Sequence, residues 1–159
     1  MTLKKQNRIL LAFILLFTFL VLISAFIIEH ALNHEPCKLC LYQRIPYFLS
    51  TILIILIFLV KKYEKITLLI LSLIFFGSAI LAFYHVGIEQ GFFDESVICV
   101  AKNLSETVSK EELLDQLKQN TISCKNISFE IFGLSLATIN TVFSLTLSVI
   151  FAKLFSNYE

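Results

Sequence analysis

Residues 9–28 read ILLAFILLFTFLVLISAFII, a run of 20 residues without a charged side chain. An α-helix rises about 1.5 Å per residue, so a run of this length matches a hydrocarbon core of about 30 Å. Three more uncharged runs follow, at residues 45–60, 66–84 and 131–152. The sequence therefore predicts four membrane-spanning helices.

The composition agrees with a chain that lies mostly in lipid. Hydrophobic residues make up 57% of the sequence, charged residues only 16%, and the mean hydropathy is +0.83. The apolar runs do not alternate as barrel strands must, which leaves helices as the spanning structure. We expect an all-α membrane protein: a four-helix bundle in a single domain of residues 1–159, with spans near 9–28, 43–60, 66–85 and 131–152. The net charge of +1 and the lack of a basic patch predict no nucleic-acid partner.

The first run follows Lys4, Lys5 and Arg8, as the apolar core of a secretory signal would. Its core is longer than that of a typical signal, and no small-residue cleavage site comes before Glu29. We therefore expect a retained first helix.

Basic residues in the short flanks predict the orientation of the bundle. Four spans place both termini on one side together with the turn at residues 61–65, and the segments 29–42 and 86–130 on the other. The flanks of the first side hold Lys4, Lys5, Arg8, Lys61, Lys62, Lys65 and Lys153. By the positive-inside rule this side is cytoplasmic. All four cysteines then lie on the outer, oxidising side.

The longer outer segment contains one helix signal. Ser109 and Glu112 form a capping box, and Leu113, Leu114 and Leu117 follow at helical spacing. This pattern predicts a short amphipathic helix that lies on the membrane or packs against neighbouring spans.

Cys37 and Cys40 form a Cys-x-x-Cys pair just before the second span. This spacing lets two sulfurs cycle between dithiol and disulfide, and a position at a helix start favours the thiolate. Cys40 is expected to be the better placed of the two. Arg44 follows four residues later, where it could hold a thiolate, a quinone oxygen or lipid phosphate. Pro46 indicates that regular helix begins near residue 43.

Cys99 and Cys124 lie 25 positions apart in the second outer segment. They could form a structural disulfide worth about 3 to 4 kcal/mol by the chain-entropy estimate, or exchange with the first pair. They do not supply the second closely spaced pair that a zinc site usually needs, so no metal is expected. A metal site completed by His30, His34 or His85 remains an alternative.

These residues resemble the DsbB family of bacterial inner-membrane proteins, which form disulfide bonds. The resemblance is carried by four blocks in order: residues 37–44, CKLCLYQR; residues 84–91, YHVGIEQG; Cys99; and Cys124 followed by residues 132–137, FGLSLA, and Asn140. Phe92-Phe93, where tryptophans are common, and Lys125, where an acidic residue is common, depart from the family pattern.

The resemblance implies a membrane oxidoreductase with four catalytic cysteines. A reduced thioredoxin-fold carrier of the DsbA type would attack a Cys99–Cys124 disulfide, Cys124 would then attack Cys37, and Cys40 would pass electrons to ubiquinone or menaquinone. Arg44 and His85 would bind the quinone.

Three other interpretations stay open at this point. A vitamin-K-epoxide-reductase-like enzyme is disfavoured, because its Cys-x-x-Cys comes late in the bundle. A non-enzymatic membrane protein would use its cysteines as metal ligands or staples, and a paralogue would serve one dedicated carrier.

Overall fold

The structure, a computed structural model, describes residues 5–31, 36–94, 124–125, 130–131 and 133–158. Helices dominate the described part of the chain. The elements in order are α1 (Lys5–His30), α2 (Lys38–Tyr42), α3 (Ile45–Leu59), η1 (Lys61–Tyr63), α4 (Glu64–Glu89), β1 (Glu130–Ile131), β2 (Leu134–Ser135) and α6 (Leu136–Ser156).

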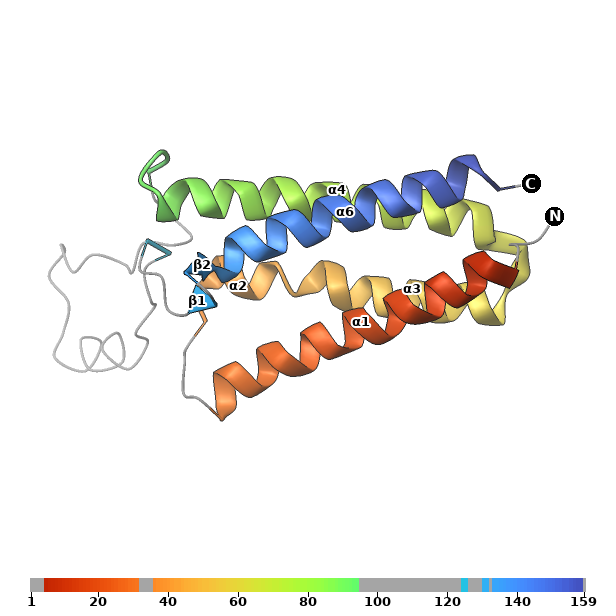
Figure 1. The fold of residues 1–159 in the computed structure, drawn as a ribbon, viewed down its shortest axis with the longest axis horizontal. Coiled ribbons are helices and arrows are strands. Elements are labelled where there is room, and N and C mark those ends of the chain that lie inside the picture. Colours follow the sequence, from red (N-terminus) through yellow and green to blue (C-terminus); the bar gives the residue numbers. More distant parts are fainter. Residues whose placement is uncertain (1–4, 32–35, 95–123, 126–129, 132, 159) are drawn as a thin grey trace, which may run out of the picture.

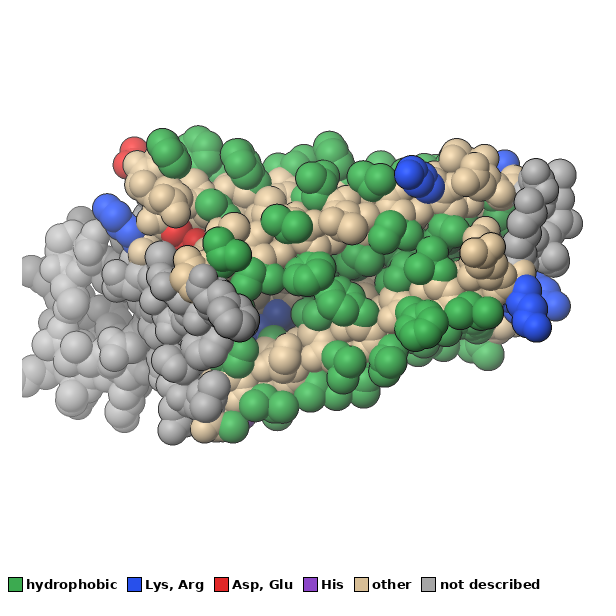
Figure 2. All heavy atoms as spheres, in the orientation of Figure 1, with side chains coloured by type: hydrophobic (Ala, Val, Ile, Leu, Met, Phe, Trp, Pro, Cys, Tyr) green, Lys and Arg blue, Asp and Glu red, His purple; other side chains and the backbone are tan. Residues whose placement is uncertain are grey.

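The long helices form a bundle, and both chain ends lie at the same end of it (Figure 1). Four helical segments are long and apolar enough to cross a membrane: Lys5–His30, Lys38–Leu59, Lys61–Glu89 and Leu136–Ser156. Hydrophobic side chains cover most of the bundle's length in Figure 2, and Lys and Arg side chains gather at the end that holds the termini. The prediction of an all-α, four-helix membrane bundle is confirmed.

The second span is interrupted at residues 43–44, just before Pro46. α2 ends at Tyr42, and α3 begins at Ile45 with Pro46 in its first turn, where a missing backbone N–H costs nothing. This break separates Cys40 from Arg44, so the two do not share a face of one continuous helix.

The prediction that the fourth helix begins at residue 131 is wrong. Two short segments, Glu130–Ile131 and Leu134–Ser135, instead form the antiparallel pair β1–β2, and Gly133 takes a φ of 76°, which suits glycine. The Ser135 side chain then caps α6 by accepting a hydrogen bond from the Thr138 N–H at 3.2 Å. The predicted amphipathic helix at residues 109–117 lies outside the described residues.

Small residues and aromatic rings bring the helices together. Ser72 on α4 and Ser148 on α6 each donate to the other's backbone carbonyl, at 3.1 and 3.0 Å. Such small residues let two helices approach closely in lipid. Deeper in the bundle, the Phe75 ring meets Tyr47 edge-on at 5.5 Å and stacks on Phe151 at 5.7 Å. α4 and α6 thus form a tight pair against which α3 packs.

An ion pair joins the helices at the end that holds the termini. Glu64, fully buried at the start of α4, accepts a hydrogen bond from Arg8 of α1 at 2.6 Å. Tyr158 donates to its other carboxylate oxygen at 3.2 Å. A carboxylate at this depth depends on such donors, because burial without them is costly.

Replacing Arg8 with methionine should lower the free energy of unfolding by about 1 to 3 kcal/mol, since a buried carboxylate loses a charged donor. Thermal unfolding in detergent, followed by circular dichroism, would measure the change. Lys5→Met is the matched control, because it removes a charge from an exposed site at the same end of α1. Equal midpoints for the two variants would contradict this role of the pair.

A buried thiol site at the far end of the bundle

Cys37 and Cys40 meet at the start of α2, at the end of the bundle opposite the chain termini (Figure 1). Cys37 is the N-cap residue of α2, and its sulfur accepts a hydrogen bond from the Cys40 backbone N–H at 3.2 Å. The two sulfur atoms lie 2.7 Å apart, and both cysteines are free thiols. The Cys-x-x-Cys spacing therefore brings the two sulfurs into direct contact.

Donors converge on Cys37, which corrects the expectation that Cys40 is the better placed thiolate. His85 of α4 places its Nε2 3.6 Å from the Cys37 sulfur. The hydrogen bond from the Cys40 thiol, helped by His85 and the Cys40 N–H, lowers the pKa of Cys37 to about 5 against the opposing effect of burial. The physical reason is position, because the N-cap residue receives the unpaired N–H groups of the first turn.

Cys124 joins this site from a distant part of the sequence. It is 1% exposed and forms a buried cluster with Cys37, which is 4% exposed, and with Leu39 and Ile88. Cys124 is disulfide-bonded. Cys99, the partner that the resemblance implies, lies outside the described residues. Three of the four predicted cysteines thus meet in one apolar cluster.

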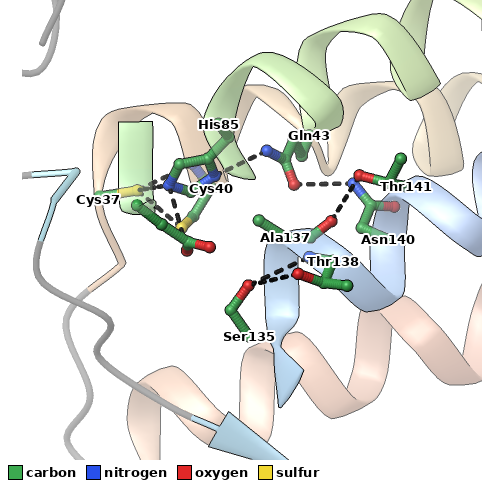
Figure 3. Close-up of polar contacts among 10 residues, drawn as sticks. Cys37, Cys40, Gln43, His85, Ser135, Ala137, Thr138, Asn140 and Thr141 are labelled. Atoms are coloured by element: carbon green, nitrogen blue, oxygen red, sulfur yellow. Dashed lines mark hydrogen bonds and ion pairs between the residues drawn. The ribbon is translucent and has the colours of Figure 1, made fainter. Parts of the chain in front are cut away.

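His85 is held on both sides of its ring, as Figure 3 shows. Its Nδ1 lies 2.9 Å from the Gln43 side-chain amide, and its Nε2 faces Cys37 and, at 3.7 Å, a carboxylate oxygen of Glu89. The side chains of His85 and Glu89 are 3% and 7% exposed. The histidine is therefore a buried residue of the site.

A chain of polar side chains continues from Gln43 into the bundle. Asn140 of α6 donates to Gln43 at 2.7 Å, and Tyr47 of α3 donates to Asn140 at 2.6 Å. Sequence analysis gave these three residues no role. The signal was present, since polar residues within apolar spans usually face the bundle interior and mark functional sites.

Arg44, the other predicted quinone-binding residue, forms an ion pair with Glu29 near the end of α1. Its side chain is 28% exposed, and its described contact is with Glu29 and not with the cysteines or His85. The pair joins the C-terminal end of α1 to the N-cap of α3. Arg44 keeps further N–H groups in its planar fork for another ligand.

The turn after α4 packs closely against the helix that carries His85. The backbone N–H groups of Phe92 and Phe93 donate to the Gly87 carbonyl at 2.8 and 3.1 Å, and the Phe93 ring stacks on Tyr84. A Cβ at Gly87 would lie 2.1 Å from the Phe93 ring. Only glycine at this position lets the ring lie flat on α4.

The same donors were weighed as a metal site. Ligand atoms of Cys37, Cys40 and His85 all lie within 4.8 Å of one another. Two sulfurs bound to one tetrahedral zinc ion at about 2.3 Å each would be about 3.8 Å apart, whereas these sulfurs are 2.7 Å apart. The arrangement fits a redox-active dithiol better than a zinc site.

The Cys37 thiolate should persist from neutral pH down to about pH 5. An ordinary thiol, by contrast, is mostly protonated below about pH 8.5. A pH titration of thiolate ultraviolet absorbance, with the Cys37–Cys40 pair reduced, would measure this. Cys40→Ala should move the midpoint upward, because it removes the main donor, and Cys37→Ala should abolish the transition. A wild-type midpoint near 8.5 would contradict the described geometry.

Comparison with known proteins agrees with this site. A family model described as "Disulfide bond formation protein DsbB" matches residues 7–154. "Uncharacterized protein RP370" of Rickettsia prowazekii (strain Madrid E) is 26% identical over 148 residues, which cover 92% of this chain and 86% of that protein. The range of the family model contains all four cysteines and all but the terminal residues of the four described helices that are long and apolar enough to span a membrane. The chain is a multi-pass membrane protein that belongs to the DsbB family of disulfide bond formation proteins.

Proposed function

We propose that this protein reoxidises a periplasmic thioredoxin-fold carrier of the DsbA type and passes the electrons to ubiquinone or menaquinone in the bacterial inner membrane. The observation that supports this best is the cluster of Cys37, Cys40 and Cys124, in which Cys124 is disulfide-bonded and the other two are free thiols. Thiol–disulfide exchange needs such proximity, because one sulfur must attack another directly.

The exchange proceeds in two steps. A carrier thiolate attacks Cys99, the Cys99–Cys124 bond breaks, and Cys124 leaves with the electron pair. Cys124 then attacks Cys37, the Cys37–Cys40 bond breaks, and the electron pair moves to Cys40. Resolution follows: the carrier's second thiolate breaks the carrier–Cys99 bond and the carrier leaves oxidised, and the freed Cys99 thiolate attacks Cys124, which re-forms the Cys99–Cys124 bond and releases Cys37. A free Cys37–Cys40 pair beside a bonded Cys124 is the state that this sequence requires before the electrons pass to the quinone.

The residues beside the dithiol suit a quinone. The second carboxylate oxygen of Glu89 has no hydrogen-bond partner among the residues that the structure describes, although the side chain is buried. A hydroxyl group of the reduced quinone would donate to this oxygen. The guanidinium of Arg44 could donate to a carbonyl oxygen of the oxidised quinone. A quinone, when bound, accepts two electrons and two protons. Arg44, His85 and Glu89 are the residues we assign to hold it.

The chain's own groups are placed to manage the thiol protons. Oxidation of the dithiol releases two electrons and up to two protons. The pKa of Cys37, near 5, means that this thiol has already lost its proton at neutral pH. Besides Cys40, His85 places its Nε2 3.6 Å from this sulfur, and Glu89 lies 3.7 Å from the same nitrogen. They would hold the remaining proton while water stays excluded from the buried cluster.

The orientation follows from charge. Basic residues gather at the end that holds both termini, opposite the cysteines (Figure 2). By the positive-inside rule we place the termini in the cytoplasm and the cysteines in the periplasm, where disulfides persist.

Detergent-purified protein should consume quinone absorbance when supplied with a reduced DsbA-type carrier, and Cys99→Ala should abolish turnover because the carrier loses its point of attack. Cys40→Ala should abolish it as well. If neither wild type nor variants consumed quinone, and the purified protein held stoichiometric zinc, the metal-binding alternative would replace this proposal.

Arg44→Lys should raise the KM for quinone about tenfold, because a point charge replaces the planar fork and about one charge-assisted hydrogen bond is lost. Steady-state kinetics at varied quinone concentration would measure this. Glu29→Gln is the control, since it removes the ion pair of Arg44 but leaves the guanidinium. An unchanged KM in Arg44→Lys would remove Arg44 from the quinone site.

A further inference from the structure

The polar chain beside the dithiol has a direction. Asn140 uses its amide oxygen to accept from two hydroxyls, Tyr47 at 2.6 Å and Ser144 at 3.2 Å. Its NH₂ group donates to the Gln43 amide oxygen at 2.7 Å. The Gln43 NH₂ group is left to face His85 Nδ1 at 2.9 Å. The hydrogen bonds of Asn140 therefore determine which way the Gln43 amide is turned. As a result, the Gln43 NH₂ group faces the imidazole.

The other side of the imidazole holds acceptors. His85 Nε2 faces the Cys37 sulfur at 3.6 Å and Glu89 at 3.7 Å. The Cys40 thiol lies against the Cys37 sulfur at 2.7 Å. A neutral imidazole has one N–H and one bare nitrogen. A donor facing Nδ1 and anionic groups facing Nε2 both select the same tautomer.

We propose that Tyr47, Asn140 and Gln43 are positioning residues that fix His85 in the tautomer with its proton on Nε2, so that a neutral imidazole donates to the Cys37 sulfur. This inference deepens the proposed function and rests on it for its catalytic meaning. Tyr47, His85 and Asn140 lie on α3, α4 and α6, and Gln43 lies in the turn between α2 and α3. The tautomer therefore depends on how these helices are assembled.

The tautomer serves the dithiol in a specific way. With Nε2–H aimed at Cys37, the thiolate gains a donor without a fixed positive charge beside it. The opposite tautomer would turn a bare nitrogen toward the sulfur, and the thiolate would lose this donor. A hydrogen bond that favours the charged form of a group lowers its pKa when the group is an acid. The chain of amides therefore acts on Cys37 through His85.

Nitrogen-15 NMR of labelled histidine reads the tautomer directly. His30→Gln and His34→Gln leave His85 as the single histidine. In detergent at neutral pH, with the Cys37–Cys40 pair reduced, we expect a pyrrole-like Nε2 and a pyridine-like Nδ1. The reverse pattern, or two pyrrole-like nitrogens, would overturn the proposal without any further variant.

Variants of the chain then test its direction. Gln43→Leu should shift the tautomer ratio about five- to tenfold toward Nδ1–H, the change expected for one lost hydrogen bond, and should raise the thiolate midpoint of Cys37 by up to about one pH unit. Tyr47→Phe should have a smaller effect, because Ser144 still donates to Asn140. Thr141→Val is the matched control, since the Thr141 hydroxyl bonds only within α6, to Ala137, among the described contacts.

The outcomes separate this inference from the proposed function. A Gln43→Leu protein that stays folded and keeps both the wild-type tautomer and the wild-type thiolate midpoint would overturn the inference. A wild-type protein with the Nε2–H tautomer but no quinone turnover would support the inference and refute the proposed function.

Discussion

A polar side chain buried in a membrane bundle must find its partners within the bundle, because lipid offers none. This constraint governs the far end of the molecule. On the Nδ1 side of His85, the buried polar groups are matched to one another: Gln43 to Asn140, and Asn140 to Tyr47 and Ser144. The helices cannot shift relative to one another without leaving one of these groups unpaired. The hydrogen-bond chain therefore fixes the position of the thiol site as well as its chemistry.

Buried polar groups are paired by different chemical groups at the two ends of the bundle. At the end with the termini, a buried carboxylate is met by a guanidinium and a phenol, which holds α1 and α4 together. At the far end, neutral amides do this work around an imidazole. Formal charge is absent from the amide chain, so the polarity on the Nδ1 side of His85 comes from oriented dipoles. Such dipoles need no reorganisation when charge develops on a nearby atom.

The sequence predicts the bundle well because an apolar run about 20 residues long forms a membrane-spanning helix in lipid. It also predicts that Cys37 and Cys40 meet, since their spacing alone limits what they can do. The sequence does not predict features that depend on how the helices are assembled. The start of α6 is displaced by a hairpin around Gly133, and the thiolate moves from Cys40 to Cys37 because the cap position and His85 act together. Gln43 and Cys37 lie 42 and 48 residues from His85 in sequence, and no local pattern relates them to it.

Cys37 combines the low pKa of a reactive thiol with a position that solvent hardly reaches. Thiolates with a low pKa are usually the cysteines that peroxide converts to sulfenic and then sulfinic acid, because such residues tend also to be exposed. Cys37 has the low pKa but only 4% of its surface is exposed. Dissolved oxidants and glutathione reach it poorly, whereas a sulfur delivered by the protein's own chain lies beside it. The cluster thus protects the thiolate from irreversible oxidation.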